Sequence, residues 1–329
     1  MLHNIEFTFP PRKKQKMDKN YTILFHGNCI DGWFSAFIAH SVLKNNGYVH
    51  MYPISPSQTN TWPSILQITG SNILLLDVSV PQHYRDMWMK GGAFSIKCID
   101  HHQTSIEHWP VDACPIQTES CAALQTWQYF YPNMEIPIWL HHIDRVDRWD
   151  NPTYEDRCIR EVLNEIAHKP VQKLFDEAFS MTDQFLMNMS NPIGTSAIIQ
   201  YGKDILEKKD AELLSILTDG AIYTFDQDYI SHWQLPNTWL DKRVFIIDNT
   251  GITLDTTEAA HLVFELHNVD VFINYRRKNI TYTYSARSRE FNISEGTVLK
   301  GHPTSAGATL IRGQVPVLPF LLHDPWKIH

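Results

Sequence analysis

The chain has 329 residues, of which 43% are hydrophobic and 19% charged, proportions typical of a folded globular protein rather than a disordered one. Its formal net charge of −8 disfavours non-specific binding to duplex nucleic acid. The length favours two domains, and the absence of a long apolar run and of an apolar signal segment predicts a cytoplasmic protein without a membrane span.

The five cysteines are odd in number and form no CxxC pair, which argues against a disulfide framework and against a structural zinc site. Residues 1–20 are polar, carry a basic cluster at 11–16, and are expected to form a disordered leader. The basic cluster leaves a nuclear address open as the weaker alternative.

From residue 21 to about 160, short apolar runs alternate with helical patterns, which predicts a doubly wound α/β domain with a mostly parallel sheet. Strands are expected at 23–25, 48–52, 72–76 and 94–99. Helices are expected at 31–43, 83–89, 119–130 and 137–145.

Residues 161–218 have helical periodicity and are expected to form a helical connector. Residues 219–329 are richer in strand patterns and predict a second, smaller α/β domain that binds substrate. Its strands are expected at 221–225, 244–247, 271–275 and 281–285, with a helix at 257–266.

Three of the predicted strands in the first domain run into residues that commonly bind metal ions, namely His26 and Asp31, then Asp77, then Asp100-His101-His102. Ligands bind outside the carboxyl ends of strands in an open α/β sheet, so these side chains are expected to converge. Oxygen and imidazole ligands favour Mn²⁺ or Mg²⁺ over a structural zinc. Asp77 follows four aliphatic residues and is the candidate for a carboxylate that bridges two ions.

A fourth candidate segment contains Asp144 and Asp147, which are three residues apart and share a helix face. One of them could reach a metal ion while the other orients a histidine, and the spacing does not decide between them.

Four segments resemble the successive motifs of the DHH phosphoesterase superfamily in order and spacing, namely His26-Gly-Asn-Cys-Ile-Asp31-Gly32, Leu74-Leu-Leu-Asp77, Asp100-His101-His102 and Ile143-Asp-Arg-Val-Asp147-Arg-Trp149. The forms of the first and fourth motifs are most similar to the NrnB-like branch of oligoribonucleases and cyclic-nucleotide phosphodiesterases. Near the C-terminus, Tyr284-Ser-Ala-Arg287-Ser288 and the glycine-rich stretch at 301–308 resemble the Arg-Ser strand and the glycine-rich loop of the DHH-associated substrate domain.

The resemblance implies a role for each matching position. The implied metal ligands are His26, Asp31, Asp77, His101 and Asp147, with Asp144 as the alternative in the fourth motif. The implied catalytic residues are Asp31, His102 beside the attacked phosphate, and Asp100, which would fix His101 by a hydrogen bond. The implied substrate-binding residues are Arg287, Ser288, Gly301, His302 and Gly307. Two Mn²⁺ ions are the implied cofactors, with Mg²⁺ or Co²⁺ as alternatives.

The first motif departs from the family pattern. Many members carry two aspartates there, whereas this chain has Asp31 alone, and Asn28 or Cys29 stands near the other position. One metal position is therefore expected to be weaker, completed by water, or selective for a particular ion. A nucleophilic role for Cys29 is disfavoured because no activating partner is evident.

The resemblance implies hydrolysis of phosphodiester bonds by metal-activated water, in a cleft between two domains that admits short single-stranded oligonucleotides or small nucleotides. The alternatives within the enzyme class are a cyclic nucleotide or dinucleotide phosphodiesterase, a phosphoadenosine-phosphate phosphatase and, least favoured, a RecJ-like exonuclease. A catalytically silent nucleotide-sensing module is the alternative of another class. Neither membrane binding nor stable binding of duplex DNA is expected, and a homodimer is left open.

Overall fold

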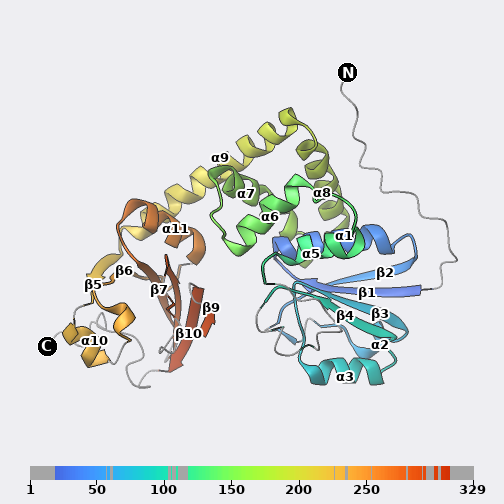
Figure 1. Ribbon diagram of the computed structural model, residues 1–329, viewed down its shortest axis with the longest axis horizontal. Coiled ribbons are helices and arrows are strands. Elements are labelled where there is room, and N and C mark those ends of the chain that lie inside the picture. Colours follow the sequence, from blue (N-terminus) through green and yellow to red (C-terminus); the bar gives the residue numbers. More distant parts are fainter. Residues whose placement is uncertain are drawn as a thin grey trace. The chain divides into compact units, whose positions relative to one another are not determined.

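The computed structural model describes residues 19–56, 58–59, 62–102, 105, 109, 118–225, 227–233, 236–252, 254–278, 281–290, 292–293, 300–302 and 305–311. The chain divides into two compact units, Met1–Leu206 and Glu207–His329 (Figure 1). The basic cluster predicted at 11–16 lies outside the described residues. Among the helices that are described, none is both long and apolar enough to cross a membrane.

The first unit is built on a four-stranded sheet in the order β2-β1-β3-β4, with every neighbouring pair parallel. Its strands are β1 (Lys19–His26), β2 (Gly47–Ile54), β3 (Ser71–Leu76) and β4 (Ser95–Ile99). The predicted α/β fold with a parallel sheet is therefore confirmed.

Helices cover both faces of this sheet (Figure 1). One face packs on α1 (Ile30–Leu43) and α5 (Ala122–Phe130), and the other on α2 (Ile65–Ile68) and α3 (Gln82–Lys90). Along β3, Leu74 and Leu76 enter the first core, and Ile73 and Leu75 enter the second. Burial on both sides explains why β3 is a continuous aliphatic run rather than an alternating one.

The strand order fixes the place of a site. From β1 the chain passes through α1 to β2 on one side, and then returns to β3 and β4 on the other side. The direction of winding therefore reverses between β1 and β3, and a crevice is expected outside the carboxyl ends of these two strands. His26 is the last residue of β1, and Asp77 directly follows β3.

The next helices of the first unit follow one another along the chain, as α6 (Ile138–Arg148), α7 (Tyr154–His168) and α8 (Phe175–Met189), and α9 (Pro192–Leu217) continues past Leu206 into the second unit. The start of α7 is fixed by a capping box in which Thr153 and Asp156 satisfy each other's backbone N–H groups. Helix α9 contributes Ile198 to the core of the first unit and Leu213 to a core of the second.

The second unit contains a six-stranded sheet in the order β5-β6-β7-β8-β10-β9. Its strands are β5 (Ala221–Thr224), β6 (Arg243–Asp248), β7 (Val271–Lys278), β8 (Thr281–Ser288), β9 (Lys300–His302) and β10 (Ser305–Ile311). Strands β6 and β7 pair in parallel, whereas the other described pairings of this sheet are antiparallel. Ala259, Ala260 and Val263 of α11 (Thr256–Leu266) form a core with residues of β6 and β7. A short helix, α10 (Gln227–Trp233), lies between β5 and β6 in the chain.

The glycine-rich loop predicted at 301–308 is instead largely strand, because β9 and β10 pair here as antiparallel strands. Gly301 pairs with Ala306, and Gly307 pairs with Ser285 of β8. A Cβ atom at Gly307 would lie 2.8 Å from the carbonyl oxygen of Tyr284. The glycine thus allows two strands to approach closely. In the sequence alone, such a glycine cannot be distinguished from a glycine in a loop.

Candidate metal centre

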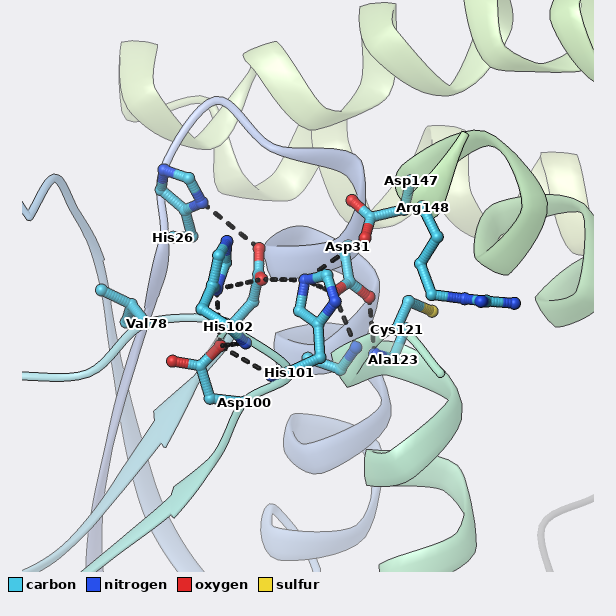
Figure 2. A network of polar contacts seen from close by, with 12 residues as sticks. His26, Asp31, Val78, Asp100, His101, His102, Cys121, Ala123, Asp147 and Arg148 are labelled. Carbon is cyan, nitrogen blue, oxygen red and sulfur yellow. Dashed lines mark hydrogen bonds and ion pairs between the residues drawn. The ribbon is translucent and has the colours of Figure 1, made fainter. Parts of the chain in front are cut away.

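Histidine and aspartate side chains from several segments meet at the carboxyl ends of β1 and β3 (Figure 2). Their potential ligand atoms form three overlapping groups, each with all its atoms within 4.8 Å of one another. These groups are Asp77 with Asp100, His101 and His102; His26 with Cys29 and Asp77; and Asp31 with His101 and Asp147. The structure thus brings together the sequence-predicted ligands of the first, second, third and fourth motifs.

Asp77 lies at the centre of the cluster and is 1% exposed. Its Oδ2 is 3.3 Å from Nδ1 of His26, and its Oδ1 is 3.4 Å from Nε2 of His101 and 3.8 Å from Nδ1 of His102. Burial by itself raises the pKa of Asp77, but the imidazoles of His101 and His26 outweigh it and hold this pKa below the ordinary carboxyl value. No described residue donates a hydrogen bond of normal geometry to either oxygen. The carboxylate is thus paired with imidazoles alone among these contacts, and both oxygens could accept a ligand.

The backbone conformation of Asp77 is also typical of a functional site. Its N–H continues the sheet ladder by donating to the carbonyl of Ile99 at 2.9 Å, but its φ is 56°. A left-handed conformation costs a residue with a Cβ atom about 1 to 2 kcal/mol. Strain of this kind is common at functional sites, where the surrounding structure holds the residue in place.

His101 stands among three carboxylates. Its Nε2 lies 3.3 Å from Oδ2 of Asp147, 3.4 Å from Asp77 and 3.7 Å from Oδ2 of Asp31. Burial by itself lowers the pKa of His101, but contact with Asp77 and the negative charges of Asp31 and Asp147 outweigh it and raise this pKa to about 10.

The carboxylates also act on one another. Burial and the negative charge of Asp77 raise the pKa of Asp31 to about 7, and burial and Asp31 raise the pKa of Asp147 well above its ordinary value. Like charges this close favour the binding of protons or cations. Divalent cations fit the donor set of imidazole and carboxylate groups, and they fit the unsatisfied oxygens of Asp77 and Asp147.

Asp31 is held by the N-terminus of α5. Its Oδ2 and Oδ1 accept hydrogen bonds from the backbone N–H groups of Ala122 at 2.7 Å and Ala123 at 2.6 Å, where the helix end favours negative charge. The sequence predicts that this helix begins at 119, but it begins at Ala122 with Cys121 as its N-cap. Sequence reasoning missed this anchor, although Ser120 just before the apolar stripe is a residue type common at helix starts.

The loop of the first motif is fixed at two further points. A Cβ atom at Gly32 would lie 2.3 Å from the carbonyl oxygen of His26, so glycine is required where α1 begins against the end of β1. Asn28 has a φ of 61°, and its side-chain oxygen pairs with Nδ1 of His168 at the end of α7. The loop is therefore bound to both α7 and β1.

Asp144, which the sequence leaves open as the alternative ligand of the fourth motif, is paired away from the cluster. Its Oδ1 accepts from the backbone N–H of Cys121 at 2.7 Å, and Arg148 donates to both of its oxygens at 3.0 and 2.7 Å. These contacts lower the pKa of Asp144 although burial opposes them. Asp147 faces His101, so the geometry favours Asp147 as the ligand from α6. Asp144 ties α6 to α5, and its hydrogen bonds within the described residues involve Cys121 and Arg148 rather than a histidine.

Asp100 also differs from the expectation. Its Oδ1 accepts from the backbone N–H of His101 at 2.8 Å and of His102 at 3.2 Å, but the imidazole that it contacts is His102, whose Nδ1 lies 2.7 Å away. Ser105 donates to Oδ2 of Asp100 at 2.5 Å. The bond to Asp100 raises the pKa of His102 and leaves Nε2 as the ring nitrogen for an outside partner.

The substrate-binding residues predicted in the second unit lie on neighbouring strands. The register sets Arg287 of β8 opposite Ser305 of β10, and Ser305 opposite His302 of β9, of which only the backbone is described. Arg287 donates to the carbonyl of Ala286 at 2.9 Å and to Oγ1 of Thr257 at 3.1 Å, and burial lowers its pKa. Ser288 ends β8 and is buried, and Gly301 and Gly307 lie in β9 and β10.

No protein-family model matches the chain. An uncharacterized protein of Acanthamoeba polyphaga mimivirus is 27% identical over 158 residues, which make up 44% of this chain and 37% of that protein, so the match spans well under half of the relative. Among solved structures, an exopolyphosphatase-related protein from Bacteroides fragilis aligns over 89% of this chain and 87% of its own, with a TM-score of 0.45 and 13% identity. A proposed family II inorganic pyrophosphatase of Methanococcus jannaschii aligns over 92% and 98%, with a TM-score of 0.30 and 14% identity. At these levels of similarity the function has to be argued from the site itself.

Proposed function

We propose that the chain is a metal-dependent phosphoesterase of the DHH type that hydrolyses phosphodiester bonds in short oligonucleotides or small nucleotides. The observation that carries this proposal is Asp77, a buried carboxylate whose oxygens accept no hydrogen bond of normal geometry from the described residues and face imidazoles at the carboxyl ends of β1 and β3. The order of the four sequence motifs and the convergence of their side chains on one cluster support it.

The ligands fall into two sets that share Asp77. His26 lies beside its Oδ2, whereas His101, with Asp31 and Asp147 around it, lies beside its Oδ1. Two ions held by these residues would supply charge stabilisation to the phosphoryl group and would lower the pKa of water. The role of the chain is to keep the ligands in place, which α5 does for Asp31 and the sheet ladder does for Asp77.

His102 is the group that we assign to the substrate. Its side chain is 39% exposed, and its Nδ1 is held by Asp100, so Nε2 carries the ring's second N–H when the imidazole is protonated. The raised pKa of His102 favours that protonated form. It can then donate to a phosphate oxygen or give a proton to the leaving oxygen. Asp100 fixes the ring, and Ser105 in turn fixes Asp100.

Residues of the second unit are proposed to bind a phosphate of the substrate. A guanidinium has five N–H donors, so Arg287 keeps donors for phosphate after its bonds to Ala286 and Thr257. Ser288, Gly301, His302 and Gly307 complete this proposed set. The net charge of −8 favours short substrates over a long duplex.

The test is a turnover panel with Mn²⁺, Mg²⁺ or Co²⁺, in which di- to pentanucleotides, cyclic nucleotides, phosphoadenosine phosphate and pyrophosphate are followed by chromatography. We expect hydrolysis of a short substrate by the wild type, loss of it in Asp77→Asn and His101→Ala, and no loss in Asp176→Asn, which changes an exposed carboxylate on α8. Equal activity in the wild type and both site variants would contradict the assigned site. A wild type that binds nucleotides but hydrolyses none would favour the sensing module instead.

A further inference from the structure

Cys29 occupies a place in the candidate centre to which the sequence assigns no role. It is the N-cap residue of α1, between His26 and Asp31, and its carbonyl accepts the N–H of Trp33 at 3.0 Å. Its Sγ, a ring nitrogen of His26 and a carboxylate oxygen of Asp77 all lie within 4.8 Å of one another. That spacing suits three donors around one ion.

Asp77 and His26 also indicate that a ligand binds beside Cys29. Asp77, which faces Cys29, is 1% exposed and has two oxygens that accept no hydrogen bond from the described residues. His26 approaches the same carboxylate from the end of β1 with its Nδ1 3.3 Å from Oδ2. A third donor beside this pair would give three protein ligands and leave a coordination position open, the arrangement typical of catalytic metal sites.

Other uses of the thiol fit less well. Burial, and then the negative charges of Asp77, Asp147 and Asp31, raise the pKa of Cys29 well above its ordinary value. A thiol in such surroundings is a poor nucleophile, because the thiolate is the reactive form. Metal binding removes this obstacle, since a bound cation displaces the thiol proton and offsets the negative charge around it.

The two ligand sets therefore differ in chemistry. His26, Cys29 and Asp77 offer nitrogen, sulfur and oxygen, whereas Asp31, His101 and Asp147 offer nitrogen and oxygen alone. Thiolates favour soft and borderline ions, and carboxylates favour Mg²⁺ and Mn²⁺. A set that contains sulfur should thus discriminate against the ions that the second set accepts.

We propose that Cys29 is a metal ligand, and that with His26 and Asp77 it forms a position selective for a borderline divalent ion such as Zn²⁺ or Co²⁺ over Mg²⁺ and Mn²⁺. This inference rests on the proposed metal-dependent phosphoesterase. It gives the single aspartate of the first motif a meaning, because the sulfur takes the place of the second carboxylate and changes the ion that is bound.

The direct test is a spectroscopic titration. The full-length chain is dialysed against a chelator, kept reduced with a phosphine, and titrated with Co²⁺. We expect a thiolate-to-cobalt charge-transfer absorption that saturates with the first ion bound, disappears in Cys29→Ser, and persists in Cys121→Ala and Cys98→Ala. Cys121 is the sharper control, because its thiol also lies close enough to Asp31 and Asp147 for their charges to raise its pKa.

Metal preference gives a second readout that does not depend on activity. Competitive equilibrium dialysis with Zn²⁺ and Mn²⁺ measures the ratio of the two bound ions in the wild type and in Cys29→Asp, which restores an all-oxygen-and-nitrogen set. We expect this ratio to fall at least about tenfold in Cys29→Asp, the lower end of what loss of even an outer-shell partner costs in affinity.

The outcomes separate the two proposals. Binding of Co²⁺ by the wild type without a charge-transfer band, or an unchanged ratio of Zn²⁺ to Mn²⁺ in Cys29→Asp, would overturn the role of Cys29 and leave the phosphoesterase intact. A band that survives in Cys29→Ser but is lost in Cys121→Ala would show that Cys121 is the metal ligand and would overturn the role of Cys29. If the wild type binds none of these ions, the proposed function itself fails.

Discussion

Asp77 and Asp156 are both buried carboxylates of the first unit, but their surroundings are opposite. Asp156 is fully buried and accepts hydrogen bonds from Arg145 at 2.7 and 2.8 Å, from the backbone and hydroxyl of Thr153 at 2.8 Å each, and lies 2.5 Å from Nδ1 of His142. Asp77 is equally hidden from solvent, yet it faces the imidazoles of His26 and His101 at 3.3 and 3.4 Å, and neither of its oxygens accepts a hydrogen bond of normal geometry from the described residues.

The contrast separates a carboxylate that holds the fold from one that serves a ligand. A buried charge is stable only when it is paired and hydrogen-bonded, and Asp156 meets this condition by linking the start of α7 to α6. Asp77 meets it only in part, because its imidazole partners His26 and His101 lie at 3.3 and 3.4 Å, and its left-handed φ adds strain. Strain of this kind at a buried carboxylate is typical of functional sites. Substitution of Asp77 is therefore expected to change mainly the activity, and substitution of Asp156 mainly the free energy of unfolding.

The largest effect is expected from Asp77→Asn. The amide cannot serve as a shared anionic ligand, so turnover of the preferred substrate should fall by more than about 100-fold, beyond the usual cost of losing an outer-shell partner. The free energy of unfolding of the metal-free chain should not fall by more than about 1 kcal/mol, because loss of the contacts with His26 and His101 is offset by relief of the repulsion between Asp77 and both Asp31 and Asp147. Kinetics and urea unfolding measure the two quantities. A large loss of stability with modest loss of turnover would make Asp77 structural.

The next largest effect is expected on metal binding, where Asp147 and Asp144 of α6 should differ. Asp147→Asn should abolish binding of one divalent ion, because its Oδ2 faces His101 and has no hydrogen-bond donor in the part of the chain that is described. Asp144→Asn should keep both ions and lose about 1 kcal/mol of stability, since it weakens the bonds from Arg148 and Cys121. Isothermal titration with Co²⁺ and thermal unfolding distinguish them. Loss of metal binding in Asp144→Asn alone would reverse the assignment.

Asp144 and Asp147 also show which features of the site can be predicted from the sequence and which cannot. The positions of His26, Asp77 and Asp100 follow from strand order, because an aliphatic run fixes where each buried strand ends. The choice between Asp144 and Asp147 does not, since both lie on one face of α6. It depends on Arg148 one turn away and on the backbone N–H of Cys121, which the start of a different helix brings to Asp144.

Contacts between distant segments also explain why the observed partners of Asp100 and Asp31 differ from those that the sequence predicts. The family resemblance implies that Asp100 orients His101. The chain turns directly after β4, however, so the carboxylate accepts hydrogen bonds from both backbone N–H groups and contacts the next imidazole, His102. Asp31 was predicted from its motif, whereas its anchor on Ala122 depends on a helix start three residues later than the pattern indicated. Contacts between segments far apart in the sequence are tertiary facts, and periodicity reports only local structure.

A smaller effect, on stability alone, is expected from Asp156→Ala. The change leaves Arg145 and His142 without their common partner, and breaking a buried ion pair costs about 3 to 5 kcal/mol. Since the Arg145 side chain is 34% exposed and water replaces part of the lost interaction, we expect about 2 to 3 kcal/mol. Urea unfolding measures it, and the number of ions bound by the folded variant should not change. Loss of metal binding with unchanged stability would place Asp156 in the site instead.

The smallest effect is the pH dependence of the same network. Burial by itself raises the pKa of Asp156, but Arg145, His142 and Thr153 outweigh it and hold this pKa below the ordinary carboxyl value. A group with a lowered folded pKa stabilises the fold fully above the ordinary pKa of about 4, and the contribution is lost as the pH falls through the folded value. The difference in unfolding free energy between the wild type and Asp156→Asn should therefore be constant from pH 7 to about 5 and should shrink by about 1 kcal/mol towards pH 2. Urea unfolding at several pH values measures this difference, and the comparison cancels the carboxylates that the two chains share. A difference that grows as the pH falls would mean that the donors around Asp156 do not stabilise its charged form.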